Sequence, residues 1–241
     1  MECCGKEGFS LKLSAHQPGY LPYPGTFAKI ADCDVFVIFD DVQYERRGFT
    51  NRCQIKTKDG PQWLTVPVES KNHFSTKIKD VRIANHHWQR KHLRSIEIAY
   101  SKAPYFRDYY QGLADLLLDC EWSYLVDLCY NLTHWLCHCL DIDPPLDKAS
   151  NYDLQGQKSD LVLDMCRQLD ADEYIFGTNG RNYVDRESFE NAGITPLFQT
   201  YRQQSYPQLH GDFVPNMSVI DMLFNCGPEA KDIILASHSV G

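Results

Sequence analysis

Residues 16–25 form a polar, proline-rich loop whose side chains could do chemistry. His16 supplies a group that acts as an acid or a base near neutral pH, and two glycines let the backbone approach a ligand closely. A rigid turn with a hydrogen-bonded structural histidine would use the same residues. The loop follows residues 11–15, whose alternation predicts a short strand. We expect His16 to be catalytic, and Gln17 and Tyr20 to contact the substrate.

A second group of functional side chains follows the apolar run 34–39, which is typical of a buried parallel strand. Asp40 and Asp41 could hold a metal or orient a cationic group, although a turn or a helix cap would also explain the pair. We expect Asp40 and Asp41 to be catalytic residues, with one of them orienting His16 or binding an amine. Residues expected to bind substrate come next. Tyr44 is expected to contact it, and Arg47, Asn51 and Arg52, with Arg46 beside them, are expected to hold an anionic group. Surface solvation would account for these arginines equally well.

A third group lies in residues 177–183, after the strand expected at 173–176. Two glycines and two asparagines suit a backbone that cradles an anion, and they suit an ordinary polar turn as well. The segment is neither a Walker loop nor a G-x-G-x-x-G motif, so the standard phosphate-loop and dinucleotide interpretations fail. The candidate substrate-binding residues here are Asn179, Arg181 and Tyr183.

No group of residues in the sequence indicates a metal site or a cofactor site. His134 and His138 stand four apart, which is compatible with a metal, but no glutamate follows the first histidine as in a metalloprotease. Any of Cys33, Cys53 and Cys226 could act as a thiolate, although nothing in the sequence places a histidine beside them. We expect no metal ligands, and the cofactor is unknown.

Strands must bring these loops together. Residues 11–39 predict a strand, a helix and a second strand, and the carboxyl ends of parallel strands form the ligand-binding edge of open α/β sheets. We predict a single α/β domain over residues 1–241, with a Rossmann-like, mostly parallel sheet and an inserted helical block at about 87–143. Other segments predict a hairpin (53–56 with 63–68), a further strand (77–83), a polar connection (146–157) and a late helix (218–224).

Composition excludes several classes of protein. The chain has 241 residues, 43% of them hydrophobic, so a sizeable core is possible and disorder is excluded. The formal net charge of −8, from 24 Lys+Arg and 32 Asp+Glu, argues against general nucleic-acid binding. The chain has ten cysteines, and several of them lie in apolar or helical runs, which predicts reduced thiols. No window predicts a membrane span or a signal peptide, and we expect a cytoplasmic protein.

Several of these segments together resemble the WbqC-like protein family, over about residues 11–227. The resemblance is carried by His16-Gln17-Pro18-Gly19-Tyr20-Leu21-Pro22, the run from Asp34 to Tyr44, Asn51-Arg52, the run from Trp63 to Val68, Lys158-Ser159-Asp160 and the segment from Ser218 to Gly227. Members of that family are associated with polysaccharide and specialised-metabolite gene clusters. The resemblance implies a biosynthetic enzyme that modifies an amino sugar or a related amine, and it assigns no catalytic residue.

We therefore expect a transferase that moves an acyl or aminoacyl group to an amine, with a small-molecule substrate and an acyl or aminoacyl carrier as partners. Two alternatives stay open. One is a nucleotidyltransferase, because a strand leading into a loop with His16, followed by Gly25 at the start of the next helix, resembles the HxGH superfamily. Thr26, however, stands where that superfamily has a second histidine. The other is a non-catalytic ligand-binding or scaffold protein of a biosynthetic pathway.

Overall fold

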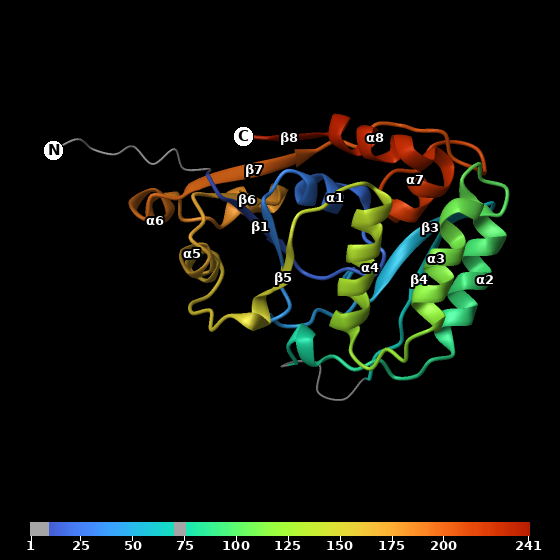
Figure 1. Cartoon of the computed structure of the whole chain (residues 1–241), viewed down its shortest axis with the longest axis horizontal. Coiled ribbons are helices and arrows are strands. Elements are labelled where there is room, and N and C mark those ends of the chain that lie inside the picture. Colours follow the sequence, from blue (N-terminus) through green and yellow to red (C-terminus); the bar gives the residue numbers. More distant parts are fainter. Residues whose placement is uncertain (1–9, 70–75) are drawn as a thin grey trace.

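The centre of the molecule is a six-stranded sheet in the order β5-β2-β1-β6-β7-β8 (Figure 1). The structure is a computed structural model that describes residues 10–69 and 76–241. All neighbouring strands are parallel except β7 and β8. The predicted α/β class with a mostly parallel sheet is confirmed. The strands are β1 (Lys12–His16), β2 (Val35–Ile38), β5 (Leu146–Lys148), β6 (Glu173–Phe176), β7 (Thr195–Tyr201) and β8 (His238–Val240).

Both faces of the sheet are buried, because successive side chains of each strand enter different hydrophobic cores. One core holds Leu13, Val37 and Phe176 together with residues of α5 (Ser159–Gln168) and α6 (Arg186–Asn191). The other holds Phe36, Ile38 and Ile175 together with residues of α1 (Pro24–Ala31), α7 (Val219–Cys226) and α8 (Ala230–Ala236). The near-continuous apolar runs of β2 and β6 follow from this two-sided burial.

The sheet connections are helical. Helix α1 joins β1 to β2, α5 joins β5 to β6, and α6 joins β6 to β7. Pro24 begins α1, where its fixed φ suits the first turn and its missing N–H is not needed. None of the described helices combines the length and the apolar character needed to cross a lipid bilayer.

Between β2 and β5 the chain leaves the sheet and builds a hairpin and three helices. The hairpin is β3 (Arg52–Thr57) with β4 (Gly60–Thr65), and the helices are α2 (Trp88–Tyr100), α3 (Phe106–Leu118) and α4 (Leu125–Cys139). Figure 1 shows them beside one end of the sheet. The helices expected between about residues 87 and 143 are present. The interpretation of the chain as one domain with a helical insertion stays a prediction.

The strand predicted at residues 77–83 is wrong. The chain forms a short 3-10 turn at Ile78–Asp80 instead, and only single bridges flank it. The polar positions of the alternation are Lys77 and Lys79, and both ammonium groups reach the Asp41 carboxylate, at 2.8 and 2.6 Å. The alternation therefore reflects an ion-pair cluster over a buried isoleucine rather than a ladder of backbone hydrogen bonds.

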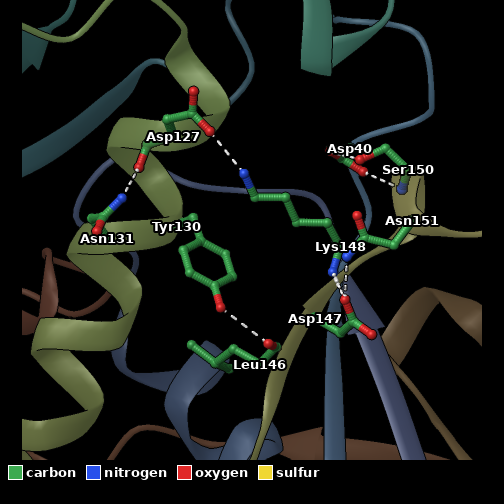
Figure 2. A network of polar contacts seen from close by, with 9 residues as sticks. All are labelled: Asp40, Asp127, Tyr130, Asn131, Leu146, Asp147, Lys148, Ser150 and Asn151. Carbon is green, nitrogen blue, oxygen red and sulfur yellow. Dashed lines mark hydrogen bonds and ion pairs between the residues drawn. The ribbon is translucent and has the colours of Figure 1, made fainter.

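The expected polar connection at residues 146–157 is also wrong in its first three residues, which form β5. Leu146 pairs with Phe36, so β5 extends the sheet beyond β2. Its polar residues are satisfied locally: Lys148 donates to Asp127 of α4 at 2.7 Å, and the Lys148 N–H donates to its neighbour Asp147 at 2.7 Å (Figure 2). A short edge strand with such residues has no apolar run for periodicity to detect.

The long segment between β7 and α7 is anchored on one buried carboxylate. Asp221 is fully buried and accepts hydrogen bonds from the hydroxyls of Tyr100 and Tyr206, both at 2.7 Å, and from the Gln208 amide at 2.8 Å. Burial raises the pKa of Asp221, and these donors oppose that rise. Gln208 in turn accepts from the Val214 N–H at 2.8 Å. One side chain thus ties α2, α7 and the intervening loop together.

We predict that Asp221→Ala lowers the free energy of unfolding by about 3–5 kcal/mol, because three buried donors lose their acceptor. Urea denaturation at neutral pH measures the change. The matched control is Asp119→Ala at the exposed end of α3, for which we expect a change within about 0.5 kcal/mol. Equal effects of the two substitutions would contradict the anchoring role of Asp221.

Candidate functional site

A cavity of about 610 Å³ opens at the carboxyl ends of β1 and β6. Of the residues predicted from sequence, it brings together His16, Gln17, Tyr20, Arg52 and Asn179. Cys53, named from the sequence as a possible thiolate, also lines it. Sequence reasoning missed other lining residues, which come from the loop after β1, from α1, from the turn before β3, from β3 and from the segment that leads into α7: Tyr23, Thr26, Glu45, Phe49, Thr50, Gln54, Asn216 and Ser218.

His16 is the last residue of β1, and its ring keeps an exposed side although protein surrounds it closely. Its Nδ1 lies 2.8 Å from the Gln17 carbonyl oxygen. A carbonyl only accepts, so Nδ1 carries the proton and the neutral ring has its lone pair on Nε2. Burial, assisted by the positive charge of Lys29, lowers the pKa of His16 to about 4. At neutral pH the cavity therefore contains an unprotonated base.

Lys29 lies behind the end of β1. Its ammonium group is buried on α1 and donates to the Ala15 carbonyl at 2.7 Å. Burial lowers the pKa of Lys29 to about 8. The group is thus mostly charged at neutral pH and disfavours a second positive charge on His16.

The loop after His16 is held by a buried aromatic cluster. The Tyr20 hydroxyl lies 2.9 Å from Nδ1 of His92 on α2, and its ring meets Trp88 edge-on at 5.8 Å. Burial lowers the pKa of His92 to about 4, while a hydrogen bond to the Thr65 carbonyl opposes this. His92 is therefore neutral, donates through its other nitrogen and accepts from Tyr20. Tyr20 lines the cavity, but its hydroxyl serves the fold.

The turn before β3 carries the predicted anion-binding residues. The Arg52 guanidinium donates to the carbonyls of Gly48, at 3.2 Å, and Arg47, and lies over the Trp63 ring at 4.1 Å. Arg47 is exposed, has a positive φ of 64° and does not line the cavity. Asn51 is buried and donates to the Val66 carbonyl at 2.8 Å. Asn51 therefore joins β4 to the turn, and Arg52 is the only one of these three at the cavity.

Tyr44 lies just before this turn and is 3% exposed, and it is not a lining residue. Burial raises the pKa of its hydroxyl, and the nearby charges of Arg46 and Arg52 oppose the rise. Its predicted contact with substrate stays a prediction.

Asp40 and Asp41 follow β2 but are not among the residues that line the cavity. Asp40 accepts from the N–H and the hydroxyl of Ser150, at 2.9 and 2.7 Å, and so joins β2 to the chain after β5 (Figure 2). Partial burial raises the pKa of Asp41, but hydrogen bonds and charges of Lys77 and Lys79 outweigh it and lower the pKa overall. Both carboxylates are thus engaged with partners other than His16.

The loop at residues 177–183 contributes only Asn179 to the cavity. The Arg181 guanidinium lies over the Phe198 ring at 4.6 Å and donates to the Gly241 carbonyl at 3.3 Å. Tyr183 is half exposed and meets Phe176 edge-on at 6.1 Å. A Cβ on Gly180 would lie 2.4 Å from that of Phe176, so this glycine has a packing role.

Two other candidates from the sequence carry little chemistry. Burial raises the pKa of Cys53 far above its ordinary value, so its side chain is a thiol rather than a thiolate nucleophile. His134 and His138 line a separate cavity of about 200 Å³ with Cys137. Within residues 10–69 and 76–241, no three His, Cys, Asp or Glu side chains are grouped to hold a metal ion.

Ser218 is the lining residue with an unsatisfied polar group. Its hydroxyl oxygen is buried without a well-formed hydrogen bond, although an interaction with this hydroxyl lowers the pKa of the Cys53 thiol against the effect of burial. Ser218 begins α7, yet its side chain makes no capping bond. Its N–H donates to the Gln54 carbonyl at 2.8 Å, and the next N–H donates to Pro22 at 2.8 Å. These bonds fix the Ser218 backbone at the cavity wall. In the sequence, a serine before an apolar helix predicts only a cap.

We predict that NMR titration of the nine histidines places two of them, His16 and His92, near a pKa of 4. Long-range ¹H–¹⁵N correlations at neutral pH should show the Nδ1-protonated tautomer for His16 and the Nε2-protonated tautomer for His92. His16→Asn and His92→Gln assign the two signals. An ordinary pKa for His16 would contradict the burial that the cavity gives it.

We also predict that Ser218→Ala raises the free energy of unfolding of the ligand-free protein by up to about 1 kcal/mol, because it removes a buried unpaired hydroxyl. The matched control is Ser14→Ala. The buried Ser14 hydroxyl donates to the Ile175 carbonyl at 2.9 Å, so its removal should lower the same quantity by about 1 kcal/mol. Urea denaturation compares them, and a similar loss for both would mean that Ser218 is bonded within the fold.

Comparisons with known proteins agree with the resemblance noted from the sequence. The chain is 37% identical over 224 residues to the uncharacterized protein Rv1507c of Mycobacterium tuberculosis (strain ATCC 25618 / H37Rv), covering 92% of this chain and 97% of that protein. No solved structure matches this chain. The sequence pattern of the WbqC-like protein family matches residues 17–233, which include most of the cavity lining. The chain therefore belongs to the WbqC-like protein family.

Proposed function

We propose that this protein is a biosynthetic transferase that moves an acyl or aminoacyl group from an activated donor to an amine, with His16 as the base. The observation that carries the proposal is the neutral His16 ring, which has a protonated Nδ1 and a free Nε2 at the wall of a cavity of about 610 Å³. General bases of this kind are most often histidines.

The position of the cavity supports ligand binding. Taken in chain order, the five parallel strands have the spatial order third, second, first, fourth, fifth, which is the order of the first five strands of a Rossmann-like sheet. We propose that the fold is of this type. In such sheets ligands bind outside the carboxyl ends of the strands where the strand order reverses. That point lies between β1 and β6, and it is where His16 and Asn179 line the cavity.

The proposed reaction is an acyl substitution. The lone pair of the amine nitrogen forms a bond to the acyl carbonyl carbon, and the bond from that carbon to the leaving group then breaks, with its electron pair moving to the leaving group. One proton leaves the nitrogen for His16 Nε2 and passes to the leaving group. Because His16 is a weak base, it acts after the C–N bond has formed, when the nitrogen is positively charged and more acidic.

Two charged residues at the cavity wall fit the two substrates. Glu45 is exposed and lines the cavity, where its carboxylate can attract the ammonium form of an amine such as an amino sugar. Arg52 lines the same cavity, with a guanidinium that suits an anionic group. By contrast, the nucleotidyltransferase alternative loses part of its support. A Cβ on Gly25 would approach the Tyr23 ring to 2.5 Å, so this glycine is explained by packing.

We predict that His16→Asn lowers the rate of amide formation by about 10²–10⁴-fold and leaves the melting temperature nearly unchanged. The asparagine amide can still donate to the Gln17 carbonyl, so the turn is kept while the base is lost. His16→Gln, whose amide extends toward the position of Nε2, should not restore the rate. The assay measures release of thiol from acyl and aminoacyl thioesters in the presence of amino sugars, with mass spectrometry of the amide.

The control is His86→Asn, which alters an exposed histidine outside the cavity lining and should leave both quantities unchanged. A large loss of stability in His16→Asn would support a structural histidine instead. Ligand binding by the wild-type protein without turnover of any donor would favour a scaffold.

A further inference from the structure

A positively charged turn flanks the cavity of an otherwise acidic protein. Arg46 and Arg47 are exposed on this turn, and Arg52 lines the cavity beside it. None of the ion pairs between described residues involves these three arginines. The chain as a whole has a formal charge of −8, so three unpaired guanidinium groups within seven residues form a distinct local field.

The turn is fixed rather than loose. The Gly48 N–H donates to the Glu45 carbonyl at 3.3 Å, and the Arg52 side chain donates to the Gly48 and Arg47 carbonyls. The charges of Arg46 and Arg52 both act on the buried Tyr44 hydroxyl and lower its pKa against the effect of burial. The guanidinium groups are thus displayed on a preorganised backbone, which reduces the entropy cost of binding an anion.

Two exposed aromatic rings stand next to these charges. Phe49 is 66% exposed and lines the cavity, and Trp63 on β4 is 40% exposed. Their centroids are 5.6 Å apart, and the Arg52 guanidinium lies on the Trp63 ring. Large aromatic side chains held in water beside a cavity are typical of a surface that stacks a ligand. We call the set Arg46, Arg47, Phe49, Arg52 and Trp63 the arginine rim.

We propose that the arginine rim binds the phosphate of an organophosphate ligand, with Phe49 and Trp63 contacting the part next to that phosphate, while the rest of the ligand extends into the cavity toward His16. This inference rests on the proposed function and identifies the ligand as the acyl donor. Activated acyl donors have phosphate-bearing leaving groups, either a phosphopantetheine thiol or a nucleotide, whereas an amine acceptor carries positive charge. Glu45 faces the cavity from the same turn, and its negative charge suits the acceptor rather than the phosphate.

The test measures binding of matched ligand pairs by calorimetry on the full chain. The pairs are 4′-phosphopantetheine against pantetheine, and AMP against adenosine; inorganic phosphate is a further probe. We expect the phosphorylated member of at least one pair to bind about tenfold or more tightly than its partner, with the preference falling as salt is added. Preference within the first pair indicates a phosphopantetheine donor, and preference within the second alone indicates a nucleotide donor.

The variants separate the arginine rim from the fold. Arg46→Gln with Arg47→Gln should remove the preference for phosphate, whereas Arg107→Gln, on the exposed surface of α3, should keep it. Phe49→Ala should weaken the binding of both ligands of the preferred pair. Arg52 is left unchanged because it holds the turn. The absence of any phosphate preference in the wild type, or its survival in the double variant, would overturn the proposal.

Failure here is distinguishable from failure of the proposed function. His16→Asn should bind the phosphorylated ligands as tightly as the wild type does, because His16 is not part of the arginine rim. If amide formed with equal efficiency from phosphorylated and unphosphorylated thioesters, the phosphate-binding role of the arginine rim would be rejected while the transferase proposal would stand. Tight phosphate-dependent binding without amide formation from any donor would support the arginine rim and reject the transferase proposal.

Discussion

The pairing of β1 between β2 and β6 is the constraint on which the site depends. His16 pairs with Ile38 of β2, and the His16 carbonyl accepts from the Phe39 N–H at 2.8 Å, so the end of β1 cannot shift without breaking the sheet. Both neighbours are parallel to β1, so their loops leave from the same edge. The chain after β1 leads to β2 on one side, whereas β6 leads to β7 on the other, and the divergence leaves a crevice between the two loops. The order of the strands therefore places His16 at the cavity.

The walls of the cavity come from segments far apart in the chain, and buried polar contacts hold them together. Tyr20 is tied to His92 of α2, and the start of α7 is tied by backbone bonds to Gln54 of β3 and to Pro22. A buried donor or acceptor that loses its partner costs about 1–3 kcal/mol, so each tie favours one arrangement of the walls over looser ones. The unsatisfied Ser218 hydroxyl stands out against this background, because most polar groups around it have a partner.

Local sequence pattern predicted the elements that bury a face along their own length and missed those that depend on distant partners. The apolar runs of β2 and β6 and the helical spacing of α4 are visible in the sequence because burial imposes them residue by residue. The strand β5 carries Asp147 and Lys148, whose partners are set by α4 and by the following turn, and no window of sequence contains that information. For the same reason His16 and Arg52 could be identified as residues at strand ends, but the engagement of Asp40 with Ser150 and the place of Ser218 in the cavity lining could not.

The electrostatic arrangement behind His16 determines what the cavity can do. A buried lysine normally requires a carboxylate partner, but among the described residues Lys29 donates to one carbonyl, that of Ala15, and lies 5.9 Å from the centroid of the Phe36 ring. The charge of Lys29 creates a positive potential at the end of β1, and this potential adds to the effect of burial in lowering the pKa of His16. An acyl substitution develops negative charge on the carbonyl oxygen in its transition state, and a positive potential that is already in place stabilises this charge without reorganisation. The burial of Lys29 thus costs stability in the resting protein and favours the charge that the proposed reaction creates.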